Sequence, residues 1–313
     1  MTIPGETAQD RLTRPAATNP MRLYWPYAIN LVLIHLAALL VLLPWCFSWL
    51  GVVICFAGLY VFGTLGINLA YHRMLTHRSL VLPKWLEYVL VTLAICCLED
   101  SPARWVAIHR LHHQHSDRES DPHSPLVTLF WGHVGWVLVK NRSHDSTVHY
   151  ERYCRDVLRD PFYFWCERKL HWFWLYIVHA LVFTAVGFGI GWATTGALIG
   201  GVQLGVSLLV WGVFLRTVLV WHITWAVNSF GHVYGYQNYE TKDSSRNNIL
   251  FALISNGDGW HNNHHAHQRC AAHGHKWWEF DVTYSTIRLL EVVGLATNVV
   301  KHPLDSAVTI EPK

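Results

Sequence analysis

Fifty consecutive residues, from Leu23 to His72, contain no Asp, Glu, Lys or Arg. A helix needs about 20 residues to cross the hydrocarbon core of a bilayer, so this run is long enough for two crossings. Pro44 and Ser48 lie near its middle, where such residues favour a tight reversal. The run therefore predicts a helical hairpin inside a membrane.

A second uncharged stretch extends from Leu170 to Leu215 and continues from Thr217 to Tyr239. The charge between the two parts, Arg216, marks either a polar contact within the last helix or its approach to the surface. Four glycines suggest the reversal of a second hairpin: Gly187, Gly189, Gly191 and Gly196. We therefore expect an all-α membrane protein with two hairpins and four crossings, at about 24–44, 49–71, 171–191 and 197–220.

Composition supports the membrane assignment and also indicates that the protein binds metal. Charged residues make up 14% of the 313 residues, against about 25% in typical soluble domains. Low charge with 52% hydrophobic residues excludes a disordered chain, and a net charge of +3 is too small to indicate nucleic-acid binding. The 17 Trp favour membrane interfaces, and the 22 His supply the commonest neutral metal ligand. The seven Cys form no CxxC pair, so we expect buried, reduced thiols.

The charges between the apolar runs predict the orientation. The two expected turns carry no Lys or Arg, whereas the segment from Arg73 to Lys169 contains thirteen. The positive-inside rule therefore places this segment, the active site and both termini on the cytoplasmic side. Within the segment, the apolar stretch from Tyr88 to Leu98 is too short to span and predicts an interfacial or buried helix. We expect a tail at 1–22, one domain at 23–300 with a cytosolic cap at about 72–170 and 228–300, and a tail at 301–313.

Eight histidines form three clusters, all outside the apolar runs or at their ends. The clusters are one HxxxxH and two HxxHH motifs: His72 and His77; His109, His112 and His113; His261, His264 and His265. Positions i, i+3 and i+4 share a helix face, so each HxxHH can direct its imidazoles to one place. The spacing of five shares no face of an α-helix, so we expect its members on opposite sides of a wide site or at a fraying end. Asn228 and His232 add a further i, i+4 pair.

The remaining histidines have simpler interpretations. We expect hydrogen-bonded or interfacial side chains at His35, His179 and His222. Four further histidines lie near the clusters and either support a metal ligand by contact or are ordinary side chains: His115, His123, His133 and His267. We expect ordinary surface positions at His144, His149, His273, His275 and His302.

The number of clustered histidines predicts two metal ions rather than one. A structural zinc needs four ligands, usually including cysteine, whereas this chain offers eight or nine histidines. Two redox metals beside a bilayer suggest oxygen chemistry on an apolar substrate. A transporter is the competing class, but transporters hold their ligands near the bilayer midplane, and these clusters fall outside the apolar runs.

The three clusters, read as HRMLTH, HRLHH and HNNHH, resemble the histidine boxes of integral-membrane fatty acid desaturases, with most likeness to the stearoyl-CoA (Δ9) type. The likeness covers roughly Gly58 to Val300. It includes the stretches 121–123 (DPH), 133–136 (HVGW), 234–236 (YGY), 245–248 (SRNN) and 257–259 (GDG).

The resemblance implies a mushroom-shaped fold of four membrane helices and a cytosolic cap around two irons, with O2 as co-substrate. By analogy with the family, one iron takes His72, His113, His232 and His265, with Asn228 bound through water. The other takes His77, His109, His112, His261 and His264. Partners for the imidazoles are expected among Asp258, Asp121 and Asn247.

The substrate side is inferred from the same resemblance. It implies a tunnel closed by Tyr60 and Thr64 in the second crossing, with Trp225 also lining it. The Arg-Asp pair that helps to hold coenzyme A in stearoyl-CoA desaturases is replaced by Ala107 and Ile108, and a later basic pair becomes Lys140 and Asn141. The acyl carrier is therefore coenzyme A, an acyl carrier protein or a membrane lipid.

The sequence thus predicts a desaturase that places a cis double bond, expected at Δ9, in a saturated acyl chain. It would draw electrons from an external donor of the ferredoxin, rubredoxin or cytochrome b5 type. A di-iron hydroxylase of fatty acids or lipids is the alternative enzyme, and a metal-handling membrane transporter or sensor is the alternative of another class.

Overall fold

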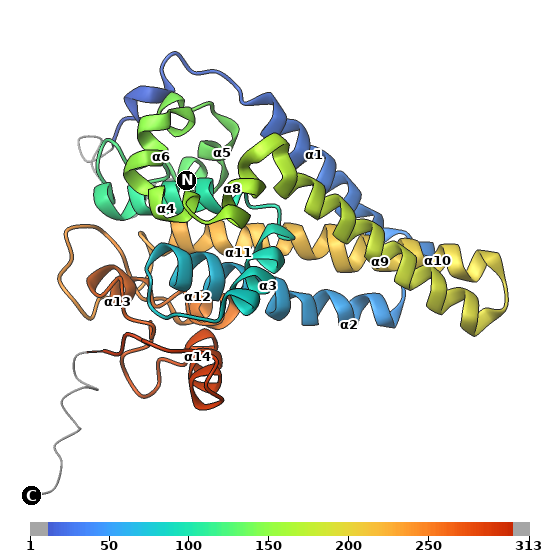
Figure 1. Cartoon of the computed structure of the whole chain (residues 1–313). Helices are drawn as coiled ribbons and strands as arrows, with labels where there is room; N and C mark the ends of the chain where they lie inside the picture. Colours follow the sequence, from blue (N-terminus) through green and yellow to red (C-terminus); the bar gives the residue numbers. More distant parts are fainter. Residues whose placement is uncertain (1–11, 303–313) are drawn as a thin grey trace, which may run out of the picture.

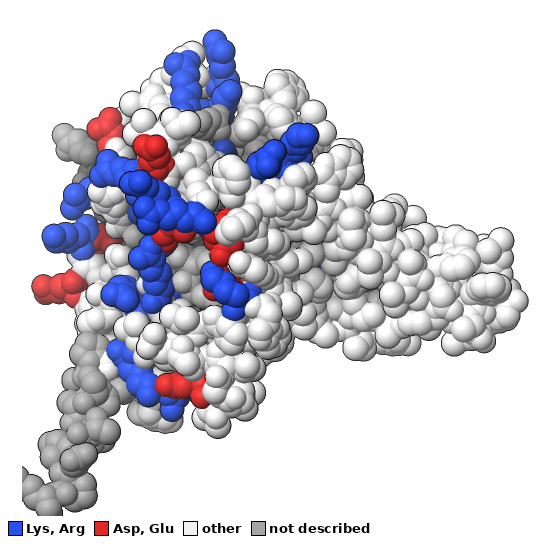
Figure 2. All heavy atoms as spheres, in the orientation of Figure 1, with Lys and Arg blue, Asp and Glu red and all other residues white. Residues whose placement is uncertain are grey.

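The computed structural model describes residues 12–302, which are helical and contain no β-strand (Figure 1). Four helices are long and apolar enough to cross a membrane: Trp25–Leu42, Trp49–Thr76, Pro161–Thr195 and Leu198–Phe230. The predicted all-α fold with four crossings is confirmed. Figure 2 shows the charged side chains gathered on one part of the molecule and a protruding arm without any.

The first hairpin turns where the sequence predicts it. Helix α1 (Trp25–Ala38) ends in two 3-10 turns, η2 (Leu39–Leu42) and η3 (Pro44–Cys46), before α2 (Trp49–Gly58). Ser48 caps α2, because its hydroxyl accepts a hydrogen bond from the Gly51 N–H at 2.9 Å. The helix then continues as η4 (Leu59–Thr76), a π-helix that carries the first histidine box into the cap.

The second hairpin reverses at Gly196, the last of the four glycines named for the turn. Helix α9 (His171–Thr195) ends at Gly196, whose φ of +68° suits a left-handed C-cap, and α10 (Leu198–Leu208) returns beside it. Gly187 and Gly191 lie inside α9 and allow close packing instead: a Cβ at Gly191 would come within 2.3 Å of the Gly200 oxygen. The returning helix continues through η8 (Leu209–Leu215) into α11 (Arg216–Phe230).

Arg216 makes a polar contact inside the helix bundle, the first of the two expected alternatives. Its guanidinium is fully buried and donates hydrogen bonds to the carbonyl of Cys96 at 2.8 Å and to that of Gly212 at 3.1 Å. It also contacts His179 and lies over the Phe62 ring. Partners of this kind are needed for a charge at membrane depth.

The cap gathers the other helices around the end of η4. The apolar stretch after Tyr88 belongs to α3 (Lys84–Ile95), which packs so closely on η4 that a Cβ at Gly66 would lie 2.6 Å from the Ala94 nitrogen. Its partly buried position is compatible with both predictions for this stretch, an interfacial helix and a buried one. The remaining elements are α4 (Pro102–His115), η5 (Trp131–Gly135), α5 (Trp136–Leu138), η6 (Arg142–Asp145), α6 (Thr147–Tyr153), α7 (Arg155–Leu158), α8 (Pro161–Glu167), η7 (Arg168–Leu170), α12 (Ile249–Ile254), α13 (His261–Ala266) and α14 (Val282–Val292), with a short η1 (Ala16–Thr18) before α1.

Candidate metal centre

The first histidine box lies at the end of the π-helix η4. A π-helix closes its hydrogen bonds over five residues, and the N–H of His77 donates to the carbonyl of His72 at 3.1 Å. His77 therefore returns above His72, with ring centroids 4.9 Å apart. Of the two expected arrangements, opposite sides of a wide site is wrong, because it assumed an α-helix. The other holds, since His77 caps the end of the helix.

The second and third boxes lie on α4 and α13, and each divides its histidines between two groups. On α4, His109 and His113 share a face while His112 points to the other group; on α13, His261 and His265 share a face while His264 does not. The two groups contain ligand atoms within 4.8 Å of one another: His72, His77, His109, His113 and His264; and His112, His232, His261 and His265. We call them the five-histidine group and the four-histidine group.

This grouping differs from the division implied by the resemblance, and which histidines bind which iron stays a prediction. His72 and His113 lie in the five-histidine group and not with His232 and His265. The physical reason is local geometry: the π-turn keeps the first box together, and each i, i+4 pair keeps its two imidazoles on one side.

The spacing of the imidazole nitrogens fits metal binding. In the five-histidine group the Nε2 of His264 lies 3.1 Å from that of His72 and 3.0 Å from that of His113. In the four-histidine group the Nε2 atoms of His232 and His261 are 3.0 Å apart. Metal–nitrogen bonds of about 2.1 Å at right angles place two nitrogens about 3.0 Å apart. The buried Nε2 atoms of His77, His112 and His265 have no hydrogen-bond partner within residues 12–302.

Four carboxylates contact the Nδ1 atoms of histidines in the two groups. The Nδ1 atoms of four histidines lie 2.9–3.1 Å from carboxylate oxygens: His72 with Asp258, His112 with Asp121, His232 with Asp117 and His265 with Asp243. A carboxylate that accepts the Nδ1 proton leaves the Nε2 lone pair for a metal. Asp258 and Asp121 are predicted partners. Asn247 instead binds Asn263 and the neighbouring backbone.

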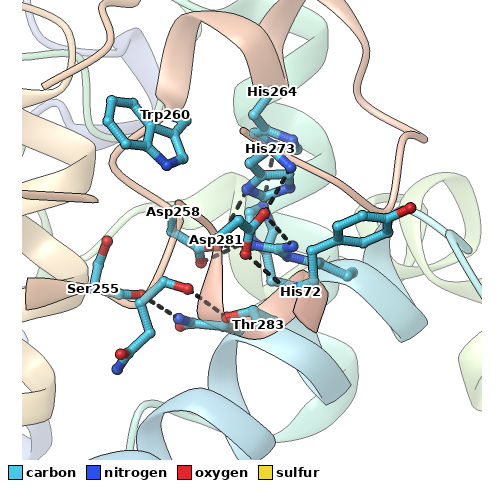
Figure 3. Close-up of polar contacts among 12 residues, drawn as sticks. His72, Ser255, Asp258, Trp260, His264, His273, Asp281 and Thr283 are labelled. Atoms are coloured by element: carbon cyan, nitrogen blue, oxygen red, sulfur yellow. Dashed lines mark hydrogen bonds and ion pairs between the residues drawn. The ribbon is translucent and has the colours of Figure 1, made fainter. Parts of the chain in front are cut away.

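His273 belongs to this site, although the sequence predicts a surface position. It is 1% exposed, its Nδ1 lies 3.2 Å from the Asp258 carboxylate, and its ring is 4.4 Å from that of His264. Figure 3 shows His72, His273 and Asp258 close together, with Asp281 beside them. The buried Arg73 joins the two carboxylates, at 2.9 Å from Asp258 and 2.8 Å from Asp281.

The protonation states suit metal binding. Burial, and after it the neighbouring imidazoles, lower the pKa well below its usual value in His77, His109, His112, His113, His261 and His264. These rings are therefore neutral near pH 7 and offer lone pairs. Burial alone would raise the pKa of Asp258, but His72, His273 and Arg73 outweigh it and lower that pKa.

Two cavities meet beside the five-histidine group. One, of about 80 Å³, lies between α1, α4 and α11; the other, of about 30 Å³, lies between η4 and α11. Both are lined by Trp105, His109, Thr224 and Asn228. The Trp105 ring stacks on His109 at 4.9 Å, and Glu99 accepts hydrogen bonds from Trp105 and Thr224. The two cavities thus adjoin at His109. The role of Asn228 as a water-mediated ligand stays a prediction.

Residues 47–287 match the sequence model of the fatty acid desaturase family. The chain belongs to the fatty acid desaturase family. It is thus an oxidoreductase that inserts a double bond into acyl chains, and the hydroxylase and transporter alternatives lose their basis.

Three relatives indicate the range of substrates in this family. The sn-1 stearoyl-lipid 9-desaturase of Anabaena variabilis is 38% identical over 92% of this chain and 97% of its own. The sn-2 palmitoyl-lipid 9-desaturase of Nostoc sp. (strain 36) is 36% identical over 96% and 99%. The icosanoyl-CoA 5-desaturase of Limnanthes douglasii is 38% identical over 87% and 71%. Lipid-linked and CoA-linked substrates both occur in these names.

Of the three tunnel residues, only Trp225 lines a cavity of this desaturase. Tyr60 is 38% exposed, and its hydroxyl lies 2.8 Å from that of Thr286. Thr64 is buried and accepts a hydrogen bond from Asn256. It lies one turn of η4 before Asn68, and Asn68 lines the smaller cavity. The structure does not bring Tyr60 or Thr64 to either cavity, and their role in chain length stays a prediction.

The positions that differ from the stearoyl-CoA type are mostly buried in this desaturase. Ala107 and Ile108 on α4 are 0% and 7% exposed, and Ile108 lines the larger cavity. Asn141 lines the same cavity and contacts His144, while Lys140 is exposed. At this end of the cavity Asp100 accepts from Tyr27 at 2.5 Å and pairs with Arg104 at 3.0 Å.

The predictions for the histidines outside the two groups are confirmed for some and wrong for others. His35 and His222 bond to each other and His179 to Arg216, as predicted. The surface prediction is wrong for His144, His149 and His302, which are buried, while His275 is half-buried. His123 stacks on His112 at 4.2 Å, His133 bonds to His222 and Ser229, and His115 and His267 are half-buried.

Proposed function

We propose that this chain is a Δ9 desaturase of acyl chains esterified to membrane lipids, and that two irons and O2 supply its oxidant. The arrangement that carries the proposal is the pair of cavities that share His109 in their lining, next to the five-histidine group. Relatives named as stearoyl-lipid and palmitoyl-lipid 9-desaturases, which match this chain over almost their whole length, support the lipid substrate and the Δ9 position.

The chain's own residues position the substrate. Trp105, held by its stacking on His109 and its hydrogen bond to Glu99, lines both cavities where they adjoin. A saturated chain lying in both cavities would pass His109, so one pair of carbons would be presented to the metal centre. The apolar walls at Leu31, Leu98 and Trp221 exclude water from it.

The histidines would hold the irons, five in one group and four in the other, and the four carboxylates would fix the rings. Bound iron would supply the oxidising power toward an unactivated C–H bond. The overall reaction removes two hydrogens from adjacent CH2 groups, and O2 with two further electrons and two protons yields two waters. The electrons come from an external donor, which we place on the cytoplasmic side with the cap and the active site.

The lipid carrier is supported by the location of the larger cavity. Tyr27, Asn30 and Leu31 of the membrane helix α1 form one wall, so an acyl chain can enter from the bilayer side. The absence of charge at Ala107 and Ile108 removes two groups that the stearoyl-CoA type uses to hold its carrier.

Purified protein in lipid nanodiscs tests the carrier. Stearoyl chains are supplied either in a glycerolipid of the disc or as stearoyl-CoA, with iron, O2 and a reducing system. We expect conversion of the lipid-linked chain and at most slow conversion of the CoA ester. Preference for the CoA ester would overturn the lipid assignment, and an alcohol product would overturn desaturation.

A further inference from the structure

An open hollow on the cap surface reaches the metal centre and shares no lining residue with the two acyl cavities. Its volume is about 460 Å³, and His77 and His113 lie in its lining. These two residues belong to the five-histidine group, whereas no member of the four-histidine group lines this hollow. The hollow therefore gives access from the surface to one of the two groups.

The rim of this hollow is positively charged. Arg78, Arg110 and Arg269 line it, and no acidic residue does. Arg110 is fixed in place by hydrogen bonds to the carbonyl of Leu75 at 2.7 Å and to that of Thr76 at 3.0 Å. One carboxylate, Asp156, pairs with both Arg78 and Arg110, so it does not neutralise the rim. Arg269 is exposed at the surface, next to Gln268.

We propose that this arginine-rimmed hollow is the docking site of a small acidic electron-transfer protein, and that electrons enter at the five-histidine group. The proposal rests on the proposed function, since desaturation needs two external electrons per double bond. The donor is oxidised by one electron at each of two encounters. The two electrons, with two protons, complete the reduction of O2 to two waters.

Three features favour a protein with an acidic surface. The arginines come from three separate segments, after η4, on α4 and after α13, so the positive charge surrounds the opening. Arg78 has a side chain that is 62% exposed and can reach a partner. Complementary charges around two redox sites bring them together quickly and release them easily, as repeated one-electron transfer requires.

The acyl path and the hollow also remain separate. The two acyl cavities contact His72, His109 and His261, whereas the hollow contacts His77 and His113. A donor seated on the hollow would therefore leave the substrate in place, and electrons can enter while an acyl chain is bound.

The test compares Arg269→Glu with a matched control, Arg142→Glu, an exposed arginine of η6 that lines none of the hollows or cavities described above. The probe is a plant-type [2Fe–2S] ferredoxin, an acidic redox protein, and its binding to the metal-loaded protein in nanodiscs is measured without substrate. We expect Arg269→Glu to weaken binding by roughly tenfold at low salt and to flatten its dependence on ionic strength. Arg142→Glu should match the wild type, and Arg269→Lys should restore most of the binding.

A second readout separates docking from chemistry. Stopped-flow absorbance follows reduction of the metal centre by the ferredoxin and, separately, by dithionite, which needs no docking site. Arg269→Glu should slow only the first. Equal ferredoxin binding by the two glutamate variants, or equally tight binding of the basic protein cytochrome c, would overturn the docking proposal while leaving desaturation intact. If the wild type forms no double bond with either reductant, the proposed function itself fails.

Discussion

The imidazole of His273 connects the five-histidine group to the Arg73 network. It touches His264 on one side and the carboxylate of Asp258 on the other, and Asp258 also holds His72. We predict that His273→Phe, which keeps a ring but loses the contact with the Asp258 carboxylate, lowers metal affinity by about 10- to 100-fold. Metal per chain after dialysis against a chelator, measured by mass spectrometry, is the readout.

His149→Phe is the matched control for this change. His149 is also buried, at 6% exposure, but it lies on α6 and belongs to neither histidine group. The control should keep the metal content of the wild type. Equal metal retention by both variants would remove His273 from the site.

Glu99 makes the larger cavity sensitive to pH. Burial raises the pKa of this carboxyl to about 7, against the effect of its hydrogen bonds from Thr224 and Trp105. Below that pH the group is neutral; above it a charge enters the apolar path, so the affinity for an acyl chain falls. We predict that KM for the lipid rises through pH 7 to 8 and that Glu99→Gln abolishes this rise. A wild-type KM that stays constant over this range would refute the assignment.

At the residue scale, the sequence predicts the nine histidines of the two groups but misses His273. Eight histidines could be found because HxxxxH and HxxHH repeat a recognisable spacing. Asp117, Asp243 and His273 lie in irregular segments, where no period relates them to a helix face. Their positions depend on long-range packing, which local spacing does not encode.

At the scale of elements, the π-helix η4 explains the first box. The spacing of five is unfavourable on an α-helix, but over a π-turn it brings His72 and His77 into contact. The place where the two cavities adjoin at Trp105 depends on the contact of α4 with η4, which no single element predicts. The assumption of an α-helix thus accounts for the wrong expectation about this pair.

Glycine contacts hold the second hairpin together. A Cβ at Gly191 would meet the Gly200 carbonyl carbon at 2.9 Å and its oxygen closer still, whereas a Cβ at Gly189 would meet nothing within 4 Å. We predict that Gly191→Ala destabilises the protein by about 1–3 kcal/mol through overpacking, and that Gly189→Ala, two residues away, does not. Unfolding in detergent micelles, followed by thermal shift, compares the two. Identical melting temperatures would contradict close packing of α9 on α10.

At the scale of the whole molecule, the two hairpins and the charged cap predict one orientation. We expect Ser146→Cys, in the cap before α6, to react with a membrane-impermeant maleimide only after cells are opened. Thr195→Cys, at the tip of the second hairpin, should react in intact cells. All seven native cysteines are buried, so background labelling should be low. The reverse pattern would place the cap and the active site outside.

Much of this architecture follows from the charge-free runs, because a bilayer dictates helix length and burial of the backbone. The turn at Gly196 also followed, but the use of Gly187 and Gly191 in packing did not, since glycine serves both reversals and close helix contacts. The acyl cavities were also missed in part: Trp225 lines one, but Tyr60 does not.

Identification of the product in cells tests the central claim most directly. The chain is expressed in a host that lacks its own acyl desaturase, and intact lipids are analysed by mass spectrometry with localisation of double bonds. The account predicts new monounsaturated chains with the double bond between C9 and C10, present in membrane glycerolipids and absent when His264→Ala replaces the wild type. Hydroxylated chains, or lipids unchanged while the protein is present in the membrane with metal bound, would contradict it.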